Sequence, residues 1–93
     1  MTSKRSYLIE DEAHAEFISE FPTLENALQE LDRISAVPWG IAPNTPPCMT
    51  GLECSREYVL VEYEVGATPY KELKRKEMLE IDAKKINWKS RTF

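Results

Sequence analysis

Two neighbouring segments near the start of the chain have the pattern of strands. Residues 6–10 form the first segment and residues 15–21 the second, with the polar residues 11–14 between them. In the second segment polar residues recur between hydrophobic ones, and because side chains point alternately to the two faces of a strand, this predicts a strand with one solvated face, joined to the first as a hairpin. We expect one face of the second strand to carry Ala15, Phe17, Ser19 and Phe21, and the other Glu16, Ile18 and Glu20.

The period then changes to steps of three and four, which predicts an amphipathic helix. Its apolar stripe contains Leu24, Ala27, Leu28, Leu31 and Ile34. Thr23 is placed to cap the first turn, and Glu25 lies where the helix dipole favours a negative charge. Pro38 cannot continue the helix, so we expect it to end near Ala36.

Alternation returns in the second half of the chain. Residues 56–65 are rich in β-branched and aromatic side chains, which predicts a strand with Val59, Val61, Tyr63 and Val65 toward the core. Tyr58 and Leu60 would lie on the opposite, partly covered face. Residues 69–87 support two interpretations. One is a helical turn after Thr68-Pro69, followed by a fourth strand with a bulge or bend near Lys84-Lys85, and the other is one continuous helix over 69–87.

These elements predict an α+β fold, with the order ββα–long loop–ββ. We expect a four-stranded, mostly antiparallel sheet with one helix on one face and a Pro/Cys-rich loop over the core. The 93 residues suit a single domain spanning 1–93, in which the loop 37–55 separates a ββα half from a β-rich half.

The loop 37–55 contains four of the six prolines, two of the three glycines and both cysteines. Proline excludes a helix or an inner strand here. The apolar side chains of this loop are expected to close the core, because leaving them in water is costly: Trp39, Ile41, Met49 and Leu52. A second role would use the exposed rim around Asn44, Glu53 and Arg56. We take Trp39, Asn44, Cys48, Cys54 and Arg56 as the candidate binding residues.

The cysteines do not form a recognisable reactive pair. Five residues separate Cys48 from Cys54, which is longer than the two to four typical of paired zinc ligands, and His14 is the only histidine. A disulfide between them would close the loop easily, but thiols stay reduced in the cytoplasm, which is the expected compartment. We therefore expect two packed thiols, no metal, no cofactor and no catalytic residue.

Charge is unevenly distributed along the chain. The net charge is −4; residues 1–65 carry four basic and twelve acidic side chains, whereas residues 66–93 carry eight basic and four acidic ones. Either these charges mix on the surface, or they form a bipolar surface. A bipolar surface would favour head-to-tail or self-complementary association of the protein with itself, including a homodimer. The acidic cluster on the first hairpin indicates a solvated face or, less often, a protein-binding or metal site: Glu10, Asp11, Glu12, Glu16 and Glu20.

The basic C-terminal segment raises the question of nucleic-acid binding. Its basic residues are interleaved with Tyr70 and Trp88, as in single-strand binders: Lys71, Lys74, Arg75, Lys76, Lys84, Lys85, Lys89 and Arg91. Acidic residues interrupt this strip and the whole chain is acidic, so nucleic acid is not the favoured partner. No apolar run approaches the length of a membrane span, and the run 7–9 is too short for a signal-peptide core. The expected location is the cytoplasm.

Several short motifs resemble an uncharacterised family of small bacterial proteins. They are Tyr7-Leu8-Ile9-Glu10-Asp11, Phe21-x-Thr23-Leu24-Glu25-x-Ala27, Pro38-Trp39, Ala42-Pro43-Asn44, Pro47-Cys48, Cys54-x-Arg56-x-Tyr58 and Glu62-Tyr63. The resemblance implies a bacterial or phage origin and no activity, ligand or catalytic residue. The function expected from the sequence is a non-catalytic protein-interaction or regulatory module that binds itself or another protein. The alternatives are a thiol- or metal-dependent site in the 38–54 loop and weak nucleic-acid binding through the basic C-terminal segment.

Overall fold

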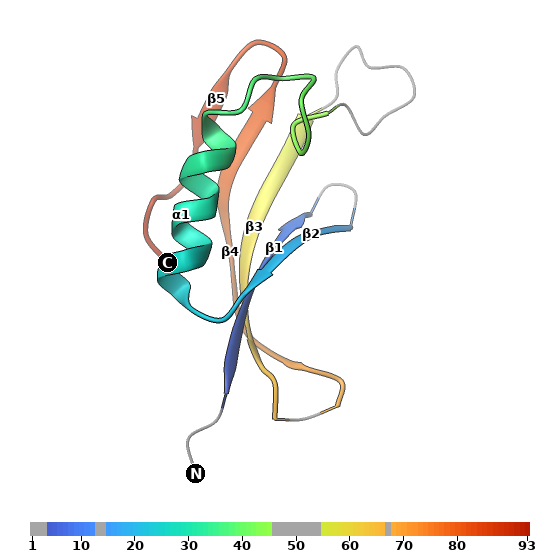
Figure 1. The fold of residues 1–93 in the computed structure, drawn as a ribbon, viewed down its shortest axis with the longest axis vertical. Helices are drawn as coiled ribbons and strands as arrows, with labels where there is room; N and C mark the ends of the chain where they lie inside the picture. The colour runs from blue at the N-terminus through green and yellow to red at the C-terminus, as the bar shows by residue number, and fades with distance from the viewer. Residues whose placement is uncertain (1–3, 13–14, 46–54, 67) are drawn as a thin grey trace.

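The computed structural model describes residues 4–12, 15–45, 55–66 and 68–93. In these residues five strands form one antiparallel sheet in the order β2-β1-β3-β4-β5, and one helix lies against one face (Figure 1). The elements are β1 (Arg5–Asp11), β2 (Glu16–Phe21), α1 (Leu24–Ser35), β3 (Ser55–Glu64), β4 (Lys71–Asp82) and β5 (Ile86–Trp88). The α+β class with a single helix is confirmed. The fifth strand corrects the expected four.

The hairpin of β1 and β2 contains a bulge that changes which side chains share a face. Ile9 pairs with Ser19, but Glu10 pairs with Phe17, so Ile18 is the extra residue. Ser19 and Phe21 stay on the helix side, whereas Phe17 turns to the opposite face and is 58% exposed. The expectation that Phe17 lies on the same face as Ser19 and Phe21 is therefore wrong.

The helix forms as its sequence predicts. The Thr23 hydroxyl oxygen accepts a hydrogen bond from the Asn26 amide at 3.2 Å, and the last turn closes at Ala36. Ala27, Leu31 and Ile34 are fully buried against the sheet. In the part of the chain that the structure describes, no helix is long and apolar enough to cross a membrane.

The core lies between α1 and one face of the sheet, and β3 contributes Tyr58 and Leu60 to it. This reverses the expected orientation of β3, in which Val59 and Val61 faced the core. All four side chains are almost completely buried, because β3 is the central strand and is covered on both faces. A strand that is apolar on both faces does not reveal from its own sequence which face the helix covers.

β4 is a strand from Lys71 onward, so the expected helical turn after Pro69 and the alternative continuous helix are both wrong. Its first half is exposed and charged because it lies at the edge of the sheet, where long polar side chains are common. Pairing with β3 outweighs the helix propensity of Lys and Glu. Leu73 and Met78 are extra residues in this pairing. The chain bends at Ala83-Lys84, close to the expected bulge or bend, but it reverses there and forms the separate antiparallel strand β5 instead of continuing β4.

Asp82 holds the turn between β4 and β5. Its carboxylate accepts hydrogen bonds from the backbone amides of Lys84 (2.7 Å) and Lys85 (2.9 Å), and these bonds lower the pKa of Asp82 below its ordinary value. A depressed pKa gives stability that is present above the ordinary pKa and is lost as the pH falls through the pKa of the folded state.

We expect an NMR titration to place the midpoint of Asp82 ionisation below that of an aspartyl residue in an unstructured peptide. A midpoint at or above it would show that these bonds do not form.

The molecule is elongated, with principal extents of 49 × 23 × 19 Å. The β3–β4 hairpin and the start of β1 form an arm that extends beyond α1 at the lower end of Figure 1. The C-terminal segment returns to the start of α1, where Phe93 packs edge-to-face on Tyr7 and the Lys74 amine donates to the Phe93 carbonyl oxygen. This segment adds cover on the helix side of the sheet. In the described residues no helix covers the opposite face, where side chains of the sheet itself bury Val59 and Val61.

Candidate functional site

Two of the predicted binding residues lie inside the protein rather than on an exposed rim. Asn44 is completely buried and Arg56 is 5% exposed. Trp39 is partly buried and packs against the core as expected, whereas Ile41 is 57% exposed and does not. The remaining residues of the predicted loop site lie outside the described residues: Cys48, Met49, Leu52, Glu53 and Cys54. A thiol- or metal-dependent site in this loop therefore stays a prediction.

Asn44 joins the segment after α1 to the central strand. Its amide nitrogen donates to the carbonyl oxygens of Ile34 (2.9 Å) and Val37 (2.8 Å), and its amide oxygen accepts from the Tyr58 hydroxyl at 2.7 Å. Burial raises the pKa of Tyr58 well above its ordinary value, so this hydroxyl remains protonated and able to donate. These bonds identify Asn44 as an anchor of the fold.

Arg56 holds four parts of the chain together. Its guanidinium donates to the carboxylates of Asp11 (3.1 Å) and Glu16 (2.6 Å), and its Nε donates to the Thr45 carbonyl oxygen at 3.0 Å. The other Asp11 oxygen accepts from the Glu57 amide at 3.2 Å. Arg56 thus brings residue 45 beside residue 56, on either side of the segment 46–54. Its donors serve this scaffold, which is a structural role.

Arg75 makes a second arginine cluster on the opposite face of the sheet. From β4 it reaches across β3 to Glu10 and Glu12, both at 3.2 Å, and it also pairs with Glu72 at 2.9 Å. Val59 and Val61 lie on β3 beneath this crossing, which explains how they are buried without the helix.

The acidic cluster predicted on the first hairpin is therefore paired within the molecule. Arg56 and Arg75 bind four of its five carboxylates, and the fifth, Glu20, accepts a hydrogen bond from the Ser6 hydroxyl. Among the described residues, no group of three or more His, Cys, Asp or Glu side chains is placed to hold a metal ion. Finding these pairs required the strand register, which sequence spacing does not supply.

The basic residues of the C-terminal segment do not form one strip. Pairing with β3 places Lys74 and Lys76 on the helix side, where Lys76 donates to the Thr92 carbonyl oxygen at 2.8 Å, whereas Arg75 lies on the other face. Lys89 pairs with Glu77 at 3.5 Å, and Arg91 lies 4.3 Å above the Trp88 ring. Basic side chains of this segment thus lie on both faces of the sheet, and nucleic-acid binding through them stays a prediction.

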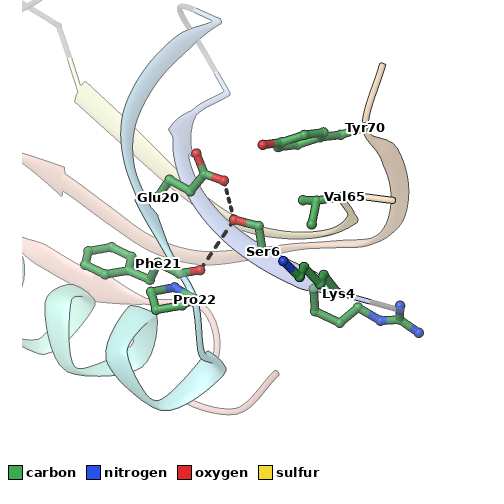
Figure 2. A pocket seen from close by; sticks show the side chains of 8 residues that line it. Lys4, Ser6, Glu20, Phe21, Pro22, Val65 and Tyr70 are labelled. Carbon is green, nitrogen blue, oxygen red and sulfur yellow. Dashed lines mark hydrogen bonds between the residues drawn. The ribbon is translucent and has the colours of Figure 1, made fainter. Parts of the chain in front are cut away.

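An open pocket of about 650 Å³ lies on the face opposite α1, where β2 ends and the arm begins. Its lining residues are Lys4, Arg5, Ser6, Glu20, Phe21, Pro22, Val65 and Tyr70. Figure 2 shows Val65 and Tyr70 on one side, Glu20, Phe21 and Pro22 on the other, and Ser6 between them. We call it the arm pocket.

The arm pocket combines an aromatic wall with a polar floor. Tyr70 is 47% exposed, and its ring packs against that of Tyr63 at a centroid distance of 6.2 Å. The Ser6 hydroxyl is hydrogen-bonded to the Glu20 carboxylate and lies 3.5 Å from the Phe21 carbonyl oxygen. No local motif predicts this site, because its residues come from three separate segments and the sequence around Tyr70 favours a helical turn.

A smaller groove of about 360 Å³ contains Trp39, the one predicted binding residue that is partly accessible in the described residues. It lies between the end of α1 and the β4–β5 turn, and Ile86, which is 51% exposed, forms part of its wall. Trp39 also packs on the core, so its position agrees with a structural role.

No family model, curated protein or solved structure matches this chain. Its function must therefore be argued from the geometry of the sheet and its pockets.

Proposed function

We propose that this protein is a small, non-catalytic interaction module that binds another protein at the arm pocket. The observation that supports the proposal is the exposed aromatic Tyr70 in an open pocket, on the sheet face that α1 leaves uncovered. Aromatic side chains with a partly apolar setting commonly anchor protein interfaces, because they bury a large area with few rotatable bonds.

The rigidity of the pocket also favours recognition of a partner. Ser6 is buried and holds Glu20, while Tyr70 rests on Tyr63, whose hydroxyl donates to Glu10 at 3.2 Å. The wall is therefore fixed before a partner arrives, which reduces the entropy lost on binding.

The test uses a random peptide library displayed on phage and selected against the full chain. We expect enriched peptides that bind the purified protein, with at least about tenfold weaker binding to Tyr70→Ala, as for an interface anchor. Phe17→Ala is the matched control, since Phe17 is an exposed aromatic on the same sheet face outside the pocket. Affinities are measured by calorimetry.

Two outcomes would overturn the proposal. One is a selection in which no peptide is enriched above an unrelated control protein. The other is a set of peptides whose binding is unaffected by Tyr70→Ala, or is weakened equally by Phe17→Ala, which would show that the arm pocket is not the binding surface.

A further inference from the structure

The backbone N–H and C=O groups of Arg5, next to the arm pocket, point away from β3. Two hydrogen bonds establish the pattern: the Val65 amide donates to the Lys4 carbonyl oxygen at 3.1 Å, and the Glu12 amide donates to the Glu57 carbonyl oxygen at 2.9 Å. Even-numbered residues of β1 thus direct their backbone groups toward β3. In an antiparallel ladder successive residues alternate, so the N–H and C=O of Arg5 point to the side of β2.

β2 does not extend far enough to pair with Arg5. The β1–β2 register ends with Tyr7 opposite Phe21, after which Pro22 leaves the sheet and Thr23 caps α1. In the described part of the chain, no backbone hydrogen bond joins Arg5 to residues 22–23. An open strand edge therefore borders the arm pocket, which Arg5 and Pro22 both line.

We propose that the arm pocket receives an extended segment of a partner protein, which pairs with Arg5 as an added strand. This inference rests on the proposed function and names the mode of binding. The residue opposite Arg5 would exchange backbone hydrogen bonds with it, in the position that β2 vacates. Its two neighbours would direct their side chains to the face opposite α1, into the arm pocket.

The lining of the pocket specifies the chemistry of that segment. Val65 and Tyr70 offer an apolar surface, whereas Lys4 is exposed and makes no ion pair within the described residues. The Arg5 side chain, in contrast, lies near Glu62 (3.6 Å) and Glu64 (3.8 Å). We therefore expect the segment to carry an apolar side chain that faces Val65 and Tyr70. An acidic side chain two positions away would face Lys4.

A separate segment fits this edge better than a second copy of the protein. The open edge is short, since β2 lies directly in line with it and α1 begins beside it. The free edge of a folded sheet would meet β2 and the start of α1, whereas a single extended segment needs only the backbone of Arg5 and the arm pocket beside it.

The experiment uses a peptide selected on the library and a series of derivatives that are N-methylated at one position each. Methylation removes a backbone donor, so strand addition predicts at least tenfold weaker binding at the residue that donates to Arg5 and less than a twofold change at its neighbours. Lys4→Glu should weaken binding of an acidic peptide at least fivefold. Lys84→Glu is the control, because Lys84 is an exposed lysine outside the arm pocket.

The outcomes separate this inference from the proposed function. If binding of a peptide is weakened by Tyr70→Ala but unaffected by methylation at every position, strand addition is overturned and the interaction site stands. If binding of an acidic peptide is unaffected by Lys4→Glu, the expected contact of its acidic side chain with Lys4 is overturned. Absence of any enriched peptide overturns both. Light scattering that shows a dimer, together with loss of that dimer in Tyr70→Ala, would assign the pocket to a second copy and contradict the separate segment.

Discussion

The Arg56→Met variant is expected to lose about 3–5 kcal/mol of unfolding free energy, the cost typical of removing one partner from a buried ion pair. Asp11 is completely buried, and the variant leaves its carboxylate without the guanidinium that lies 3.1 Å away. The variant also releases Glu16 and the Thr45 carbonyl oxygen. Urea denaturation at neutral pH, monitored by tryptophan fluorescence, measures the difference.

Arg75→Met provides the matched control. Arg75 binds three carboxylates, but it and its partners are partly exposed, and pairs of this kind contribute about 1 kcal/mol or less. Equal losses in the two variants would contradict the buried role of Arg56. So would an Arg56→Met protein as stable as the wild type.

Asn44→Ala is expected to lower the unfolding free energy by about 2–4 kcal/mol. The substitution removes the acceptor of the buried Tyr58 hydroxyl and one donor to each of the carbonyl oxygens of Ile34 and Val37. The Ile34 carbonyl oxygen keeps the hydrogen bond from the Val37 amide at 3.0 Å. An unsatisfied buried group costs about 1–3 kcal/mol, and water entering the new space would offset part of the sum. The same denaturation experiment measures the change.

Asn87→Ala is the control for this prediction, because Asn87 is exposed on the edge strand β5. Substitutions at such positions usually change stability by about 0.5 kcal/mol or less. If the two variants differ by less than about 1 kcal/mol, the hydrogen bonds of Asn44 do not hold the 36–45 segment on β3.

The helix and the strands β1, β2 and β3 were predictable from the sequence because their signals are local. Thr23 caps α1, and the apolar stripe of α1 has the helical period. The charged half of β4 was not predictable, because its strand state depends on pairing with β3 rather than on its own residues. The same holds for Phe17, whose face is decided by one extra residue in the ladder.

The exposed rim expected around Asn44 and Arg56 is wrong, because both side chains are buried. Whether the five predicted residues bind a partner stays a prediction. Asn44 and Arg56 are polar, and an exposed rim was the simplest expectation for them. Burial of such groups requires partners, and those partners come from distant positions, namely Tyr58 for Asn44 and Asp11 with Glu16 for Arg56. The arm pocket likewise forms from residues that only strand pairing brings together, so no local sequence motif predicts it.

Binding of a partner at the arm pocket, on the sheet face opposite α1, is tested by backbone amide NMR of the full chain, recorded with and without a library-selected peptide. We predict chemical-shift changes centred on Ser6, Glu20 and Tyr70, together with slower hydrogen exchange of the Arg5 amide. Shift changes centred instead on the exposed face of α1, or on the groove at Trp39 and Ile86, would contradict the account.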